Sequence, residues 1–227
     1  MAKTLQLRRG TTAYGASFTG AQGELFVNTT TYALYVHDGS TVGGHAIGAL
    51  DSYCSFFPSG AGSLTNSTGK SNVAIGCTSL AGNLSGYNNI GFGQSALCSN
   101  TTGHDNIAQG FNALSKNTIG YGNIAIGCST LGNNTTGCNN IAVGAQSLYG
   151  NITGVYNVAL GYQSLCGNTG GCSNVAIGNS TLKQNTIGNN NTAIGNFALA
   201  CNTTGCNNFA VGLQALLCNT FGLITRL

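Results

Sequence analysis

The sequence predicts an all-β protein: a trimeric parallel β-roll, or β-solenoid, of nine 17-residue repeats that follows a small N-terminal β-meander module. Three observations support this fold class. Residues 69–221 repeat with a period of 17 and contain no insertion or deletion. Each repeat carries one short apolar strand between Gly and Asn positions. No 3.6-residue periodicity is present, and so many Gly and Asn residues would destabilise a helix. A fixed period of this kind indicates one structural unit stacked on itself.

Five positions are identical in all nine repeats, and we number the positions of the repeat as columns 1–17. Columns 1 and 8 are Gly, columns 4 and 15 are Asn and column 12 is Leu; in the first repeat these are Gly69, Gly76, Asn72, Asn83 and Leu80. Gly tolerates positive φ, and Asn tolerates left-handed backbone and bonds its own chain, so these columns are expected at tight corners. The stacked Asn side chains are also expected to form amide ladders along the array.

Columns 5–7 form the predicted strand, as in the Val-Ala-Ile sequence of residues 73–75. Side chains alternate along a strand, so columns 5 and 7 share one face and column 6 takes the other. We expect the large residues of columns 5 and 7 in a packed core, and the small residue of column 6 where another backbone comes close. Column 12 belongs to a second short segment, so each turn is expected to hold two short strands and two corners.

The core of a single 17-residue coil is thin, because the coil encloses few large side chains. Small cores rarely bury enough apolar surface for independent stability. Association of several chains side by side would supply the missing burial. The sequence therefore predicts a homo-oligomer, most simply a homotrimer.

Charged side chains are scarce, at 5% of the 227 residues. Sparse cations form no basic stripe, so nucleic acid is not an expected partner. No apolar run is long enough for a spanning helix, and the first residues lack the apolar core of a signal peptide. Nine of the ten cysteines fall in variable columns, where a rung spacing of about 4.8 Å brings only Cys201 and Cys218 near bridging distance. Free thiols and assembly in a cytoplasm are the simplest interpretation.

The repeats lack the residues that covalent chemistry needs. Glycoside hydrolysis uses two carboxylates, and the array has one, Asp105. The histidines, His37, His45 and His104, have no metal-ligand or triad spacing, and no glycine-rich loop joins a strand to a helix. The sequence therefore predicts a protein that is not an enzyme, with no catalytic residue, no cofactor and no metal site.

Aromatic side chains in variable columns are the candidate receptor contacts. Column 2 carries Tyr87, His104 and Tyr121 on three successive repeats. The candidate glycan contacts are Tyr87, Tyr121, Tyr149, Tyr156 and Tyr162. An exposed ring offers a flat apolar face to a sugar, and neighbouring amides offer donors and acceptors. The alternative is that the rings stack on one another and fill a ladder between repeats.

The third repeat departs from the others, because Gln109 occupies column 7, where every other repeat has an apolar residue. In a trimer with column 7 near the axis, three Gln109 amides are expected to form an axial polar layer. That layer either satisfies its own hydrogen bonds or holds a water molecule or an ion.

Column 16 is Thr in seven of the nine repeats, which raises a different class of function. A flat Thr ladder resembles that of β-helical ice-binding proteins. Those proteins pair two Thr columns, whereas column 17 here mixes several residue types. A solitary ice- or ligand-binding solenoid is therefore an alternative interpretation of the repeat array.

The N-terminal region carries a second, non-repetitive pattern. Residues 25–27 and 33–36 are predicted strands, and Asp38-Gly39 is a turn signal. With the segment LQLRRGTT at residues 5–12, this pattern resembles the N-terminal domain of the phage major tropism determinant. The resemblance implies a module on the virion-proximal side of a tail fibre, docked to another virion protein.

The repeats resemble the head repeats of trimeric autotransporter adhesins and, more closely, the arrays of phage tail fibres, as in NTAIG at residues 191–195. The resemblance implies a trimer of left-handed parallel β-rolls, location in the virion and attachment to a glycan or protein of the host surface. No membrane insertion is expected, because no apolar run is long enough to span a bilayer. A bacterial trimeric adhesin is the nearest alternative, and the missing signal peptide and membrane anchor weigh against it.

The predicted organisation has four parts: an attachment or trimerisation module (residues 1–50), a linker or degenerate first turn (51–68), the shaft (69–221) and a C-terminal cap (222–227). The last residues are apolar where a solenoid end should be polar. We therefore expect a partner-docking end at Phe221, Leu223, Ile224 and Leu227.

Overall fold

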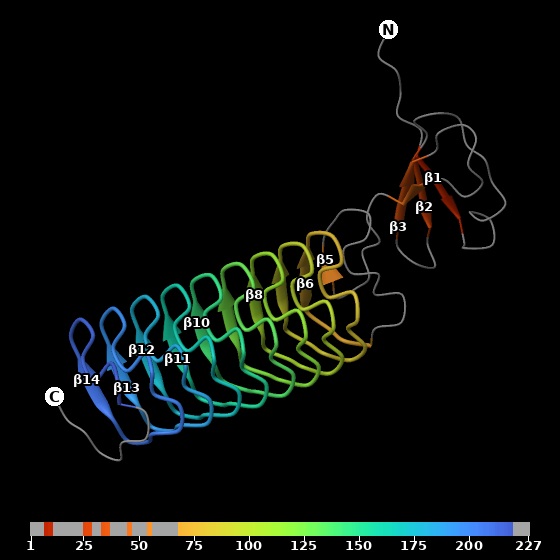
Figure 1. The fold of residues 1–227 in the computed structure, drawn as a ribbon. Coiled ribbons are helices and arrows are strands. Elements are labelled where there is room, and N and C mark those ends of the chain that lie inside the picture. Colours follow the sequence, from red (N-terminus) through yellow and green to blue (C-terminus); the bar gives the residue numbers. More distant parts are fainter. Residues whose placement is uncertain are drawn as a thin grey trace, which may run out of the picture. The chain divides into compact units, whose positions relative to one another are not determined.

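The computed structural model describes residues 7–10, 25–28, 33–36, 45–46, 54–55 and 68–219. The chain divides into two compact units, Met1–Pro58 and Ser59–Leu227. The regular elements of the described residues are all strands, drawn as arrows in Figure 1. Among these residues no helix has the length and apolar character needed to cross a bilayer.

The first unit contains a four-stranded sheet in the order β1-β2-β3-β4. Its strands are β1 (Leu7–Gly10), β2 (Leu25–Asn28), β3 (Ala33–Val36) and β4 (His45–Ala46). β2, β3 and β4 pair antiparallel, as a β-meander does. β1 pairs parallel to β2, with Leu7 opposite Leu25, which the sequence pattern does not predict. The expected Asp38-Gly39 turn lies outside the described residues, and a further two-residue strand, β5, spans Cys54–Ser55.

The repeat array forms a ladder of parallel strands, one from each repeat (Figure 1). The strands are β6 (Asn72–Ile75), β7 (Ile90–Phe92), β8 (Ile107–Gln109), β9 (Ile124–Ile126), β10 (Ile141–Val143), β11 (Val158–Leu160), β12 (Val175–Ile177), β13 (Thr192–Ile194) and β14 (Phe209–Val211). Neighbouring strands pair in register at the repeat period, as in Ile141 opposite Val158. The predicted parallel β-solenoid, with one 17-residue repeat for each rung, is confirmed.

Each rung contains one strand and not the two expected. The segment around Leu80 and its equivalents forms turns. Columns 10 and 12 have left-handed backbone, with φ of 58° at Ser95 and 53° at Leu97 in the second rung. The preceding column 8 glycine also has positive φ, 133° at Gly93. Left-handed residues so close together curl the chain back, which is incompatible with a second extended strand.

The strands face the opposite way from our expectation. Column 6 points into the coil, where Ala125 and Ala142 are fully buried. Columns 5 and 7 point outward, and Ile141 and Val143 are 39% and 36% exposed. The reason is space, because the far side of the same rung lies close behind the strand. At Gly91 an added Cβ would lie 3.3 Å from Ala96 O of the same rung and would collide with Ser79 Oγ of the rung before it.

Stacked identical columns build the interior. Leu in column 12 packs with Ala in column 6 in one continuous apolar cluster. The two Asn columns are buried as well. Asn106 Nδ2 donates to Asn89 Oδ1 at 3.1 Å, and Asn117 Nδ2 donates to Asn100 Oδ1 at 2.8 Å. The expected amide ladders are therefore confirmed.

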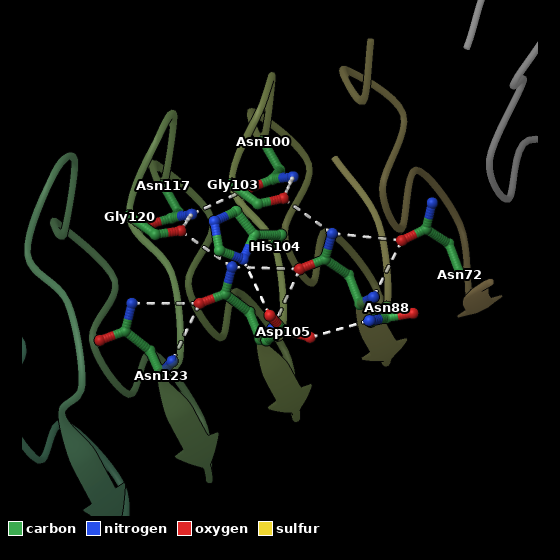
Figure 2. A network of polar contacts seen from close by, with 11 residues as sticks. Asn72, Asn88, Asn100, Gly103, His104, Asp105, Asn117, Gly120 and Asn123 are labelled. Carbon is green, nitrogen blue, oxygen red and sulfur yellow. Dashed lines mark hydrogen bonds and ion pairs between the residues drawn. The ribbon is translucent and has the colours of Figure 1, made fainter. Parts of the chain in front are cut away.

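The two amide ladders meet at the carbonyl of column 1 (Figure 2). Asn106 Nδ2 and Asn117 Nδ2 both donate to Gly120 O, each at 2.9 Å. A Cβ at Gly120 would lie 2.5 Å from Gly137 O, so the close approach of successive rungs requires Gly in this column.

The invariant Asn residues are not the left-handed corner residues that we expected. The positive-φ residues of the first repeat are Ser71, Gly76, Thr78 and Leu80, and neither column 4 nor column 15 is among them. Burial and amide bonding explain why both columns hold Asn, since each amide both donates and accepts along the ladder.

The nine cysteines of residues 68–219 are free thiols, including Cys201 and Cys218. Cys77, Cys128 and Cys218 are exposed. Burial raises the pKa of the Cys166 thiol, and nearby Lys183 opposes this rise by a smaller amount.

Candidate functional site

Three aromatic rings form a column on the second, third and fourth rungs. The centroids of Tyr87 and His104 lie 4.7 Å apart with the ring planes 1° from parallel. His104 and Tyr121 stack in the same way at 4.9 Å and 9°. These separations match the spacing of about 4.8 Å between paired strands, which the in-register rungs impose on every column. Because both faces of His104 are stacked, a ligand meets this ring mainly at its edge.

Asp105 stands beside His104, the middle ring of this column (Figure 2). Its Oδ2 lies 2.8 Å from His104 Nδ1, and its Oδ1 accepts a hydrogen bond of 3.0 Å from Asn88 Nδ2. The hydrogen bond with His104, followed by that with Asn88, lowers the pKa of Asp105 below its ordinary value. The carboxylate is therefore ionised at neutral and mildly acidic pH.

The backbone of column 3 places Asn88 and Asp105 for this contact. Their φ angles are 54° and 55°, in the left-handed region that Asn and Asp tolerate better than most residues. Successive rungs then hold the amide and the carboxylate one above the other.

The aromatic column, Asp105 and Asn88 together define the receptor-contact candidate, which we call the Tyr-His-Tyr site. It offers phenol, imidazole, carboxylate and amide groups, a set that suits a ligand rich in hydroxyl groups. Asp105 is the only acidic side chain among the described residues, so the second carboxylate of a glycosidase is not found in this part of the chain. Residues 68–219 and the described strands before them bring no three His, Cys, Asp or Glu side chains together as metal ligands.

The other candidate tyrosines do not belong to this column. Tyr149, Tyr156 and Tyr162 occupy columns 13, 3 and 9 on the fifth and sixth rungs. The ring of Tyr149 covers Gly132 of the rung before it, where an added Cβ would lie 3.1 Å from Tyr149 Cε2. Tyr156 is the most exposed of the candidates at 61%.

A second candidate surface is the outward side of strands β6–β14, formed by columns 5 and 7, which we call the strand face. Its large apolar side chains are 36–49% exposed at Ile90, Phe92, Ile107, Ile126, Ile141, Val143, Ile194, Phe209 and Val211. Gln109 lies exposed in this face, with Phe92 and Ile126 as its neighbours on adjacent strands. A parallel sheet is ordinarily covered on both sides, and an exposed apolar patch of this extent marks an interaction surface.

The Thr hydroxyl groups of column 16 bond within the array. Thr101 Oγ1 donates to Thr118 O at 2.9 Å, and Thr118 Oγ1 donates to Thr135 O at 3.0 Å. Thr186 Oγ1 bonds Thr203 O in the same way at 3.0 Å. These hydroxyl protons serve rung-to-rung bonds, so the ladder favours a structural role over ice binding.

The sequence pattern alone identified the ring column but not the whole site. The 17-residue spacing of Tyr87, His104 and Tyr121 placed these rings in line. The same spacing relates Asn88 to Asp105, a signal that lies outside the aromatic pattern. The proposed docking end at Phe221, Leu223, Ile224 and Leu227 lies outside the described residues, so it stays a prediction.

The fold and these surfaces define a class of protein: a tandem-repeat β-solenoid with an apolar strand face and a separate N-terminal β module. Residues 5–41 match the family described as the major tropism determinant N-terminal domain. A tail fiber receptor-binding protein of Bordetella phage BPP-1 is 45% identical to the chain over 51 residues. That stretch is 22% of this chain and 13% of the phage protein. No solved structure matches the chain significantly. These findings confirm the resemblance to phage tail-fibre proteins.

Proposed function

We propose that this protein is a structural and adhesive component of a phage tail fibre, in which three copies of the solenoid form a shaft that contacts the host surface. The match of residues 5–41 and the similarity to a tail fiber receptor-binding protein support the tail-fibre assignment and location in the virion. In this proposal the N-terminal module docks to another virion protein. The protein performs no covalent chemistry and uses no cofactor.

The strand face is the observation that carries the three-chain shaft. At the exposed fractions measured, its apolar side chains present on the order of 1,000 Å² per chain, compared with about 800 Å² per partner in a standard interface. Burial of that surface against other copies would supply the stability that one thin coil lacks. Identical chains that associate through one face form closed symmetric assemblies, and three strand faces meet around a single axis.

The mass of the full-length protein in solution tests the shaft. Light scattering after size exclusion should give about 69 kDa, three times the chain mass of 22.9 kDa. Ile141→Asp places a charge in the strand face and should yield monomers or aggregates. Ile187→Asp is the matched control, because Ile187 is apolar and 57% exposed but lies in column 17, outside the strands. A monomeric wild-type protein, or equal loss of assembly in both variants, would contradict the proposal.

The Tyr-His-Tyr site is the proposed host contact, together with the exposed Tyr149, Tyr156 and Tyr162. Its edge-on rings and its Asp105 and Asn88 side chains provide donors and acceptors for sugar hydroxyl groups. These groups lie in columns 2 and 3, outside the strand face.

An array of purified bacterial surface polysaccharides tests this contact. The double variant Tyr87→Ala with Tyr121→Ala, and the single variant Asp105→Asn, should lose binding while the trimer mass is retained. Phe111→Ala is the matched control, because it removes a ring that is 48% exposed but lies in column 9, outside the proposed contacts, and it should keep both binding and trimer mass. Retained binding by both site variants would exclude the Tyr-His-Tyr site as the contact.

A further inference from the structure

Gln109 is the one carboxamide on an otherwise apolar strand face. Column 7 of the described rungs contains Ile75, Phe92, Gln109, Ile126, Val143, Leu160, Ile177, Ile194 and Val211. Column 5 holds one polar residue, Thr192, whose short side chain keeps a methyl group on that face. Gln109 therefore places two amide donors and a carbonyl acceptor in a surface built for apolar contact.

The Gln109 side chain has no hydrogen-bond partner among the described residues of its own chain. Its neighbours in the sheet are Phe92 on β7 and Ile126 on β9, which offer no polar side-chain atoms. Glutamines in column 10, by contrast, do find partners within the chain: Gln163 Nε2 donates to Gln146 Oε1 of the adjacent rung at 2.7 Å. A partner for Gln109 must come from water or from another chain.

Chains built from equal rungs face a particular difficulty when they associate side by side. Because each rung repeats after 17 residues, a neighbouring chain displaced by one rung still sets strand against strand and apolar residue against apolar residue. Apolar burial alone hardly distinguishes the correct alignment from the displaced one, since burial is non-directional.

We propose that Gln109 selects the axial register in which the three chains assemble. In register, the three amides lie at one level and each can donate to the next around the axis, so the layer satisfies its own hydrogen bonds. Displaced by one rung, each amide faces Phe92 or Ile126 of the neighbouring chain and is buried without a partner. An unsatisfied buried amide is costly, and a single buried Asn sets register in coiled coils for the same reason. This inference rests on the three-chain shaft proposed above.

A change in the position of this amide tests the register. In the double variant Gln109→Ile with Ile126→Gln, the chain has the same composition but carries its amide one rung later. The variant and the wild-type chain, both full length and differently tagged, are co-expressed, and native mass spectrometry counts homotrimers and mixed trimers. Random mixing gives a 1:3:3:1 distribution, as two tagged wild-type chains should. We expect mixed trimers of the moved-amide chain to be at least about tenfold depleted, because one amide in each would lack its partners.

A matched control moves another glutamine by one rung outside the strand face. Gln94→Phe with Phe111→Gln makes the equivalent exchange in column 9, where both side chains are exposed. This chain should mix with wild type at random.

A cysteine reporter in column 7, Leu160→Cys in both chains, shows the alignment of any mixed trimers that form, because the native cysteines lie outside columns 5 and 7. Mixed trimers in random proportion, with disulfides that join the reporter thiols of unlike chains, would overturn the role of Gln109. Depletion of mixed trimers, or mixed trimers displaced so that the reporter thiols of unlike chains do not cross-link, would support it. A wild-type monomer would instead overturn the shaft itself.

Discussion

The inner and outer sides of the same strands contain opposite kinds of residue. Inside, column 6 is Ala on every rung except at Gly91, and it packs with an unvarying Leu in column 12. Outside, columns 5 and 7 range from Thr and Val to Phe and include Gln109. The inner residues touch copies of themselves on the rungs above and below, whereas the described part of the chain leaves the outer residues uncovered. The comparison shows that the interior fixes the geometry of the rung and leaves the outer residues free to vary.

The largest loss of stability is expected from a substitution in column 1, where each Gly lies against the carbonyl group of the next rung. Gly120→Ala would place a Cβ 2.5 Å from Gly137 O and beside the amides of Asn117 and Asn134. Because the obstacle is backbone, we expect a loss of about 3–5 kcal/mol in the free energy of unfolding, measured by chemical denaturation. Gly132→Ala is the control, because its new Cβ would lie 3.1 Å from the movable ring of Tyr149. Similar losses in both variants would contradict the special role of column 1.

The second-largest loss of stability is expected when a buried Asn is removed from an amide ladder. Asn123 is fully buried, and its Nδ2 donates to Asn106 Oδ1 and Gly137 O while its Oδ1 accepts from Asn140. Asn123→Ala interrupts the ladder and should cost about 2–3 kcal/mol, since buried partners are left unsatisfied. Asn133→Ala removes only the half-buried partner of the Lys116 ammonium group and should change the denaturation midpoint little. Equal midpoints for the two variants would mean that the ladder contributes nothing beyond packing.

A third substitution tests how tightly the interior of the coil is packed. Ala125→Leu adds volume at a fully buried position of column 6, and overpacking should cost about 1–3 kcal/mol by the same measurement. Ala145→Leu makes the same substitution in column 9, which already holds Leu213 in the ninth repeat, and should be close to neutral. If Ala125→Leu were tolerated equally well, the inner side would have room that the structure does not show.

The smallest expected effect concerns the exposed Asp105. Since hydrogen bonds lower its pKa below the ordinary 3.8, its contribution to stability is complete above that pH and is lost as the pH falls through the lowered value. Thermal unfolding of the wild type and Asp105→Asn should therefore differ above pH 4 and converge in stronger acid. The difference in Tm should be about 1 °C or less, because exposed ion pairs contribute little. A difference that grows as the pH falls below 4 would have the wrong sign.

Much of the fold could be predicted because the period is so regular. The 17-residue spacing gives the in-register pairing of Ile141 with Val158 and the stacking of Tyr87, His104 and Tyr121. Alternation separates column 6 from columns 5 and 7 but does not say which side faces inward, since that depends on the space inside the coil. The left-handed backbone at Leu97 and Tyr156 was also unpredictable, because neither residue type favours it.

The two Asn ladders meet at a Gly carbonyl on each rung, so each rung makes the same bonds to its neighbours across a span of 17 residues. Any rung can therefore rejoin any other after a whole repeat is lost or duplicated in frame. Recombination between the coding segments of two repeats can lengthen or shorten the array while the remaining rungs keep the bonds of both ladders. Surface side chains are gained or lost with their rungs, so loss of the rung that carries His104 would bring Tyr87 and Tyr121 onto adjacent rungs.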